Sequence, residues 1–469
     1  MTAGGRLSLR IAAITLAAIV AFVAAQAAAT PTAVEGFERL LGLVVLAGIA
    51  AAAVAAPPAW MVSIALALSM FQGSWDSMGA PIDFDRYAVL LAIASVLARE
   101  WRHRDGRLQT RPIDWLLAVA ALYVLCSILV SGQVSNEDAR FEFLDRFGLI
   151  PFALFFVAPF AFRTEADRRV LLGTLLGVGT YLGITAILET TGPEALVVPH
   201  YINDPTQGIH ADRARGPFLE AGANGIVMYA CGVAAIIAFT KWRSPRARAL
   251  ALFVAALCLV GVILALTRVV WIGAAVASPL TLAAARETRR FVVPTLAVGT
   301  LLTILALATI PGAASRVDRR KNDTTKTVWS RKSSNAAAVR MIADRPLLGF
   351  GWGRFDSTSR PYYRTAPDYP LTFVPQNNLH NVYLANAVEL GLLGGVLWAA
   401  ALLAALAGAI LRRGPPELRP WKLGFMAVAL AQLIAWATIP AEYIMPTLLL
   451  WLWAGVAWGP DETRFPAAR

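Results

Sequence analysis

Apolar runs follow one another along almost the whole chain and are separated by short polar turns. A helix that crosses a membrane needs roughly 20 apolar residues, or about 17 at the short end. About fourteen segments meet this criterion, or about twelve if the short proline-containing ones are kinked or re-entrant. They cover residues 11–29, 40–56, 59–71, 87–97, 115–130, 149–162, 170–188, 225–240, 250–266, 270–285, 292–310, 382–411, 423–438 and 444–458.

Composition supports the same conclusion. Hydrophobic residues make up 57% of the chain and charged residues 15%, and the mean hydropathy is +0.59, which excludes an ordinary soluble domain. The sequence therefore predicts an all-α, polytopic membrane protein. Cys126, Cys231 and Cys258 all lie in apolar segments, which predicts small core residues and neither a disulfide framework nor a metal site.

Positively charged turns predict the orientation. Lys and Arg gather in alternate turns, as in cytoplasmic loops; these turns lie within residues 99–111, 163–169, 241–248, 286–290 and 412–422. We expect both termini in the cytoplasm, with 11–29 an uncleaved first helix. Because most of the net charge of +12 lies in these turns, it indicates topology and predicts no nucleic-acid partner.

The longest polar segment, residues 312–381, is predicted to be an extracytoplasmic loop before the last three helices. It separates N-terminal helices in 1–190 and central helices in 191–311 from C-terminal helices in 382–469. Residues 312–379 contain twelve Lys and Arg but five Asp, which suggests an anionic partner, either lipid head groups or a phosphate-bearing substrate. Within this loop, the polar residues 321–335 predict a flexible or acceptor-facing stretch.

His380 is the candidate catalytic residue. It follows a polar stretch and immediately precedes an apolar helix, so its imidazole is expected near the outer membrane surface, able to accept a proton near neutral pH. A helix-capping histidine would fit the same position.

Three arginines are candidates for binding an anion. Arg213 and Arg215 precede a helix that is expected to begin near Gly225, and Arg268 lies in a tight outer turn between two spans. Guanidinium groups and helix N-termini both attract phosphate. A solvated loop charge at Arg215 and a snorkelling side chain at Arg268 are the alternatives. Together, a base and an anion clamp are what transfer from a phosphate-activated lipid requires.

Four stretches of the chain resemble the O-antigen ligase and polymerase superfamily of bacterial membrane glycosyltransferases. They are RGPFLEAGANG from Arg215, LTRVVW around Arg268, ADRPLLGFGWGRF from Ala343 and LHNVYLANAVELGLLGG from Leu379. The resemblance implies a GT-C-like fold and an inverting, metal-independent transfer of a glycan from an undecaprenyl-diphosphate carrier, without a cofactor. Arg215 and Arg268, with Arg213, would bind the diphosphate, and His380 would assist the attacking hydroxyl.

Further residues are expected to support the site: Asn381, Glu389, Asn224 and Arg345. Glu389 is expected to pair with a buried arginine or to orient a neighbouring helix. Where members of the superfamily often carry an Asn-Pro-Asn type sequence after the first arginine, this chain reads FLEAGANG, so that only Asn224 could take its place. The aromatic residues of the outer loop, among them Trp352 and Phe355, suit stacking on sugar rings, and an aromatic belt at the membrane surface would also explain them.

The resemblance predicts a ligase-like enzyme in the bacterial inner membrane, with its active site on the periplasmic side. The expected partners are the lipid-linked glycan donor, a glycan, lipid or protein acceptor, and membrane lipids. A polysaccharide polymerase of the same superfamily is the first alternative. A transporter of lipid-linked glycans, or a non-catalytic component of an envelope-assembly complex, is the second.

Overall fold

The computed structural model describes residues 56–78, 83–103, 110–312, 314–315, 317–318, 324–363, 379–440 and 443–459. These residues form helices and connecting turns, with no strand among them, which confirms the all-α prediction. The predicted segment 11–29, and all but the last residue of 40–56, lie outside the described residues. The other twelve predicted segments are helical.

The helices vary from one turn to eight turns in length. They are α3 (Pro58–Leu68), α4 (Phe84–His103), α5 (Pro112–Val130), α6 (Glu137–Phe141), the π-helix η3 (Glu142–Phe147), α7 (Leu149–Ala161), α8 (Glu165–Thr191), α9 (Ala221–Lys241), α10 (Pro245–Leu264), α11 (Arg268–Ala284), α12 (Val292–Thr309), α14 (Thr324–Asp344), α15 (Phe355–Ser359), α16 (Val382–Leu411), α17 (Arg419–Trp436) and α18 (Ile444–Trp458). Short 3-10 turns include η5 (His200–Asn203), η6 (Gly216–Phe218) and η8 (Arg360–Tyr362).

Seven helical segments are long and apolar enough to cross a membrane by length and composition: Pro112–Val130, Glu137–Ala161, Glu165–Thr191, Ala221–Lys241, Pro245–Leu264, Arg289–Thr309 and Val382–Leu411. Three shorter apolar segments accompany them, Pro58–Phe71, Arg268–Ala284 and Ile444–Trp458. The chain is therefore a polytopic membrane protein, as predicted.

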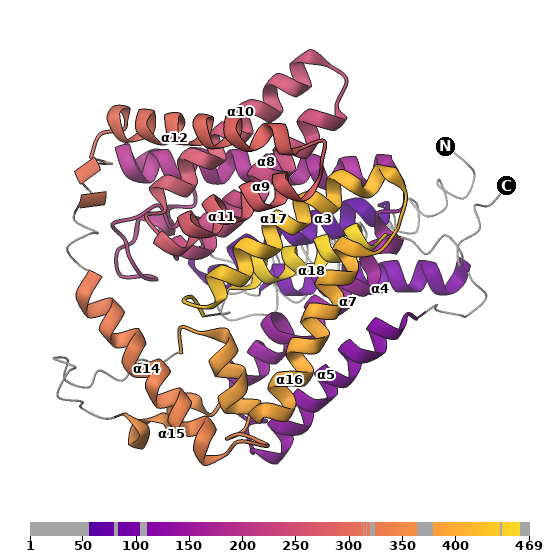
Figure 1. Ribbon diagram of the computed structural model, residues 1–469, viewed down its shortest axis with the longest axis vertical. Helices are drawn as coiled ribbons and strands as arrows, with labels where there is room; N and C mark the ends of the chain where they lie inside the picture. Colours follow the sequence, from indigo (N-terminus) through magenta and orange to yellow (C-terminus); the bar gives the residue numbers. More distant parts are fainter. Residues whose placement is uncertain are drawn as a thin grey trace, which may run out of the picture.

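Helix α18 forms the centre of the molecule. Every residue from Ile444 to Ala457 is buried, and Figure 1 shows α7 and α17 on either side of it. A Cβ on Gly455 would lie 2.5 Å from the carbonyl oxygen of Phe155, so α7 and α18 approach closely because of this glycine. A helix that is apolar all round belongs inside a bundle, which explains this position.

Small residues also bring α8, α9 and α10 together. A Cβ on Gly179 would lie 2.8 Å from both the Cβ of Cys231 and the sulfur of Cys258. These two cysteines are buried and free, which confirms their prediction as small core residues. Cys126 is also free but lies exposed on α5, so for this residue the prediction of a core position was wrong.

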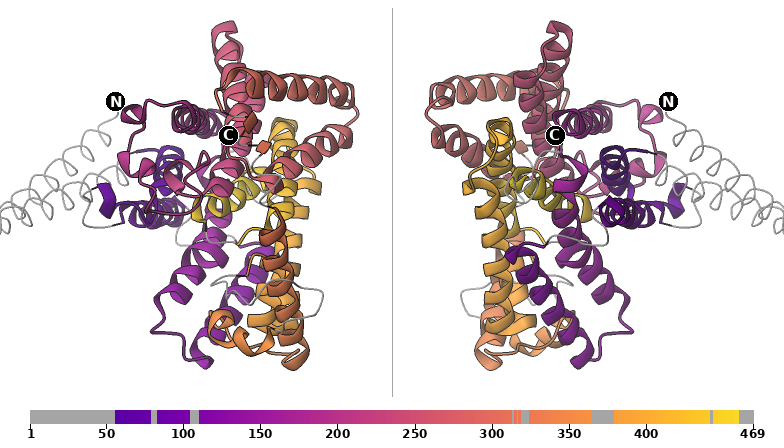
Figure 2. Two further views of the ribbon diagram at one scale, coloured as in Figure 1. Left: turned by 90° about the vertical axis from the view of Figure 1, so that its left-hand side faces the viewer. Right: turned by 90° about the vertical axis from the view of Figure 1, so that its right-hand side faces the viewer.

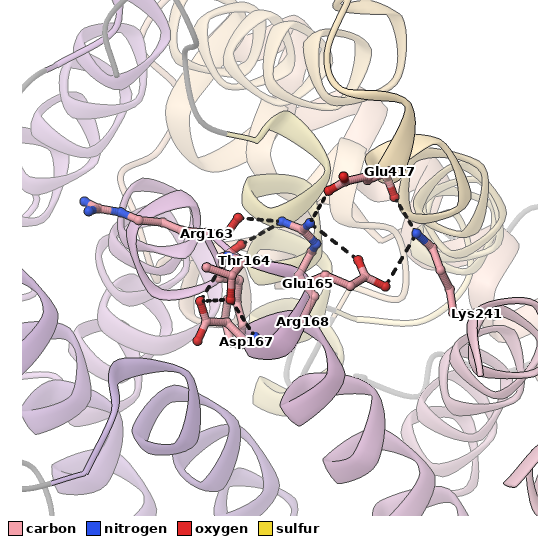
Figure 3. Close-up of polar contacts among 8 residues, drawn as sticks. Arg163, Thr164, Glu165, Asp167, Arg168, Lys241 and Glu417 are labelled. Atoms are coloured by element: carbon pink, nitrogen blue, oxygen red, sulfur yellow. Dashed lines mark hydrogen bonds and ion pairs between the residues drawn. The ribbon is translucent and has the colours of Figure 1, made fainter. Parts of the chain in front are cut away.

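The predicted cytoplasmic turns share one side of the molecule. Arg168, at the start of α8, is buried. Figure 3 shows its guanidinium pointing toward Glu165 and toward Glu417, in the turn between α16 and α17; the distance to Glu417 is 3.3 Å. Lys241, at the end of α9, donates to the carbonyl oxygen of Glu417 at 3.0 Å. Two more ion pairs join the neighbouring basic turns, Arg163 with Glu100 and Arg419 with Glu287. The basic turns that the sequence grouped together are thus close in space.

At the opposite end, an outer lobe extends away from the helical body (Figures 1 and 2). It contains α14, α15, residues 345–363 and the first part of α16, and it lies beside the end of α5. Its own small core consists of Ala338, Met341, Phe355, Leu379 and Val388. The stretch 321–335 was expected to be flexible or acceptor-facing. From Thr324 onward it forms part of helix α14, which packs on α16 through Ala338 and Met341, so for these residues the prediction of flexibility was wrong.

Candidate functional site

The candidate site begins at a break in α16, which the sequence presents as one continuous apolar run. Gly391 adopts a φ of 66° and a ψ of −178°, a conformation that only glycine adopts readily. The break divides α16 into residues 382–390, in the outer lobe, and residues 392–411, which return along α5 toward the helical body (Figure 1). Glu389 therefore lies at the end of a short helix rather than deep in a straight one.

The break leaves several backbone N–H and C=O groups of α16 without hydrogen-bond partners inside the helix. The segment Pro346–Trp352 supplies these partners. The N–H groups of Phe350 and Gly351 donate to the carbonyls of Val388 and Glu389, each at 2.9 Å. In the other half, the N–H groups of Leu392 and Leu393 donate to the carbonyls of Pro346 and Leu347, at 2.8 and 3.3 Å. The Tyr123 hydroxyl donates to the carbonyl of Leu390 at 3.0 Å. Unpaired backbone groups are costly when buried, so these contacts stabilise the break. Gly349 permits the close approach, because a Cβ there would lie 2.4 Å from the carbonyl oxygen of Val388.

His380 lies half-buried one residue before the N-cap of α16. The cap itself is Asn381, whose Oδ1 accepts from the N–H of Leu384 at 3.1 Å. Asn381 thus performs the capping function that had been an alternative explanation for His380. The hydroxyl of Tyr383, the second residue of α16, donates to the carbonyl of Leu433 on α17 at 2.7 Å. This bond fixes the start of α16 against α17.

Arg268 is the first residue of α11, and Thr267 is the N-cap. Helix α10 ends at Leu264, which confirms the predicted tight turn between two apolar helices. The side chain of Arg268 is half-buried. A guanidinium at a helix N-terminus adds its charge to the positive end of the helix dipole, so the position suits an anion.

Arg215 is buried, with 2% of its surface exposed, and its guanidinium is occupied by backbone carbonyls. It donates to Ile202 from Nε at 3.2 Å and from Nη2 at 2.8 Å, and it also reaches Asp204 and Gln207. Burial lowers the pKa of Arg215, while Glu189 and Asp204 oppose that shift. These contacts make Arg215 an organiser of the loop before α9, and the diphosphate-binding role that the resemblance implies for it stays a prediction.

The main chain at Arg215 is fixed as well. The carboxylate of Glu189, at the end of α8, accepts from the N–H groups of Arg215 and Gly216, each at 3.0 Å. Asn224 is fully buried on α9 and donates to the carbonyl of Ala214 at 3.0 Å. A Cβ on Gly216 would approach the Asn224 amide to within 2.9 Å. Asn224, on α9, therefore holds the loop in place through Ala214 and Gly216.

Arg213 lies near two other charged side chains, Glu220 and Arg331, at the start of α9. It is buried, and its Nη2 lies 3.1 Å from Nδ1 of His210. Glu220 is the N-cap of α9 and accepts from the N–H of Ala223 at 2.6 Å. Burial raises the pKa of Glu220, and the positive charges of Arg213 and of Arg331, on α14, act against that shift. The structure thus brings the basic helix α14 to the same helix start as Arg213.

The structure places two of the expected supporting residues, Glu389 and Arg345, in the outer lobe. Glu389 was expected to pair with a buried arginine or to orient a neighbouring helix. Its Oε1 accepts from the backbone N–H of Phe355 at 3.0 Å, so it positions α15, which agrees with the second alternative. Arg345 is exposed after the end of α14, with its guanidinium 4.8 Å from the ring centre of Phe350. It thus packs on the outer lobe.

A cavity of about 720 Å³ lies between the outer lobe and the helical body. Residues of α6, η3, α15, α16, α17 and α18 line it, and its wall combines aromatic rings with carboxylates and amides. Leu379 and Val382, on either side of His380 in sequence, belong to this wall. Among the described residues, no group of three or more His, Cys, Asp or Glu is placed to hold a metal ion.

Sequence reasoning found Trp352, Phe355 and Glu389 of this cavity but missed Asn386, Trp398 and the residues before α7. One signal was available: Asn386 and Glu389 are three residues apart in an apolar stretch, so a helix places both on one side. The residues from Gln133 to Glu142 gave no such signal, because only the folded chain brings them to α16.

The fold and the cavity together define an all-helical, polytopic membrane protein with a polar and aromatic site between its outer lobe and its helical body. Residues 253–399 match the family model described as O-Antigen ligase. This match confirms the resemblance to the O-antigen ligase and polymerase superfamily, and it contains Arg268, Arg345, His380 and Glu389. No curated protein matches the chain.

Proposed function

We propose that this protein transfers a glycan from an undecaprenyl-diphosphate carrier to an acceptor hydroxyl, as an O-antigen ligase-like glycosyltransferase on the outer face of the bacterial inner membrane. One observation carries the proposal. The matched segment 253–399 contains both Arg268 and His380, and each lies at or directly before the N-terminus of an apolar helix, α11 and α16. Both termini of the chain are proposed to be cytoplasmic.

Arg268 is proposed to bind the diphosphate. As the bond between the sugar C1 and the phosphate oxygen breaks, negative charge grows on the leaving diphosphate, and a guanidinium at a helix N-terminus stabilises that charge. Arg213 is the second candidate, at the start of α9. Arg215 acts indirectly in this proposal, because it fixes the loop that presents Arg213. No metal ion is required for this charge neutralisation.

His380 is proposed to act on the acceptor. A sugar hydroxyl is a weak nucleophile, and a neutral imidazole that accepts its proton assists its attack on C1. The new bond forms between the acceptor oxygen and C1 while the diphosphate leaves from the opposite side, so the configuration at C1 inverts. The proton is held on His380 and then passes to the departing phosphate or to water.

The test measures glycan transfer by the purified full-length protein in nanodiscs, with lipid-linked glycan extracted from the host membrane and the host acceptor fraction. His380→Ala is expected to lower the rate roughly 10²–10⁴-fold with donor binding retained. Arg268→Ala is expected to lower both transfer and donor binding. EDTA is expected to leave the rate unchanged. Product length separates single transfer to an acceptor from chain extension by a polymerase.

Two exposed residues provide matched controls. His200→Ala removes an imidazole from η5, and Arg290→Ala removes a guanidinium from the turn before α12. Both variants are expected to transfer at the wild-type rate. Full activity of His380→Ala would refute the catalytic role of His380, and absence of transfer by the wild type would favour a transporter or a non-catalytic assembly component.

A further inference from the structure

We propose that the 720 Å³ cavity is a carbohydrate subsite that holds the sugar rings of the glycan next to the His380 segment. The inference rests on the proposed function, because it names the part of the protein that would bind the carbohydrate of the substrate. The volume lies within the range of roughly 300–1,000 Å³ that is usual for small-ligand sites, so several pyranose rings fit.

Aromatic rings form one part of the cavity wall. Trp352, Trp398, Trp436 and Trp451 all line it, together with Phe147. Phe147 and Trp352 stand edge to face with ring centres 4.7 Å apart, and Trp398 and Trp436 lie 6.2 Å apart. Indole rings present broad apolar faces with little rotational freedom, which suits them to the C–H faces of a pyranose.

Hydrogen-bonding groups form another part of the wall. Carboxylates come from Asp138, Glu142, Asp356 and Glu389, and amides from Gln133 and Asn136. Carboxylates accept hydrogen bonds from hydroxyl groups, and amides both donate and accept. The acidic side chains of Asp138, Glu142 and Asp356 in this wall disfavour a diphosphate. The cavity chemistry therefore fits the hydroxyl-rich part of a lipid-linked glycan, while the diphosphate is left to the arginines.

Asn386 gives independent support for a ligand. Its side chain lines the cavity and is 5% exposed, and its Nδ2 has no hydrogen-bond partner among the residues that the structure describes. A buried donor without a partner costs about 1–3 kcal/mol, and such a group in a native structure calls for an explanation. A sugar hydroxyl in the cavity would supply the missing acceptor.

The closing experiment measures carbohydrate binding without transfer. Tryptophan fluorescence of the purified full-length protein is recorded during titration with two probes. The first is the oligosaccharide released by mild acid from lipid-linked glycans of the host. The second is the oligosaccharide released from the surface glycolipids of the host. Quenching by the first probe assigns the cavity to the donor glycan, and quenching by the second assigns it to the acceptor.

Two variants that replace an amide by an apolar side chain decide the role of the cavity. Asn386→Leu removes the unpartnered amide from the cavity wall. Gln432→Leu removes another buried side chain, on α17 and outside the cavity lining, whose Oε1 has no partner within the described part of the chain. We expect the first variant to weaken binding at least about tenfold, the loss of one hydrogen bond, and the second to bind within about twofold of wild type.

Each outcome has one meaning. Equal binding by Asn386→Leu and Gln432→Leu, or no binding of either probe by the wild type, would overturn the subsite. Neither result bears on the proposed glycan transfer, which the His380 and Arg268 variants test separately. Conversely, loss of binding in Asn386→Leu together with no detectable transfer by the wild type would support the subsite and reject the enzyme.

Discussion

The backbone N–H of Phe355 donates to Oε1 of Glu389 at 3.0 Å, and both residues are buried. This bond joins the start of α15 to the end of the first half of α16. It also fixes two parts of the cavity wall relative to each other, because both residues line the cavity. The shape of the proposed subsite thus depends on an acidic side chain that binds main chain.

Replacement of Glu389 tests this role. Glu389→Ala leaves the buried N–H of Phe355 without an acceptor, which costs about 1–3 kcal/mol, so we expect a lower thermal midpoint and faster proteolysis within residues 345–390. Glu389→Gln keeps an acceptor oxygen and should lie between Ala and wild type. Equal stability of the Ala variant and the wild type would show that the bond does not hold the outer lobe.

Gly391 is predicted to be irreplaceable. A Cβ there would lie 2.2 Å from the carbonyl oxygen of Leu347 at a φ of 66°, so Gly391→Ala should prevent the break in α16 from forming and sharply reduce the yield of folded protein. Gly395→Ala is the matched control, because its Cβ meets nothing closer than 3.5 Å. Gel filtration in detergent separates the two outcomes, and a well-folded Gly391→Ala protein would contradict the prediction.

Arg215→Lys separates a structural role from contact with the diphosphate. One ammonium cannot replace a guanidinium that reaches Ile202, Asp204 and Gln207 together. Because hydrogen bonds to charged groups contribute about 1.5–3 kcal/mol each, we expect a clearly lower thermal midpoint. Arg268→Lys, at a half-buried helix start, should unfold near the wild-type temperature. If Arg215→Lys kept its stability but lost donor binding, Arg215 would instead be assigned direct contact with the diphosphate.

Asp85 predicts a pH dependence of stability. Burial raises its pKa from 3.8 to about 6, and the bond from Trp75 opposes this shift only in part. Between these two values the folded state binds more protons than the unfolded state, so the free energy of unfolding falls as the pH rises through about 6. We expect Asp85→Asn to be more stable than wild type at pH 8, by about 3 kcal/mol at most.

The comparison of thermal midpoints at pH 5 and pH 8 tests this prediction. The advantage of Asp85→Asn should shrink at pH 5, where the wild-type carboxyl is largely protonated. Asp83→Asn is the control for removal of a charge, because its side chain is 43% exposed and pairs with Arg86. An equal advantage for Asp85→Asn at both pH values would rule out titration of Asp85 as its cause.

The helical bundle could be predicted from the sequence because the lengths of its apolar runs translate directly into helices. The break in α16 could not be predicted, because residues 382–411 are apolar on both sides of Gly391. A hydropathy pattern does not show where a helix changes direction. The cause of the break lies about forty residues earlier, in backbone groups of the RPLLGFGWG segment that meet α16 only after folding.

The candidate site was predicted in part for a similar reason. The positions of His380 and Arg268 at helix starts follow from where polar residues meet apolar runs. Burial of Arg215 depends instead on the loop that contains Ile202 and Gln207, which has no periodic pattern. The cavity draws residues from six helices, and Asn386 was the one member whose spacing from Glu389 carried a readable signal.

The contacts between residues 346–353 and the two halves of α16 have a consequence for protein engineering. Each piece supplies the main-chain partners of the other, so residues 346–411 form one exchangeable cassette. A chimera of two relatives should fold when its crossover falls before Pro346 or after Leu411. A crossover between Phe355 and Val382 would combine a loop and a helix from different parents, and any difference in their geometry would leave both helix ends uncapped.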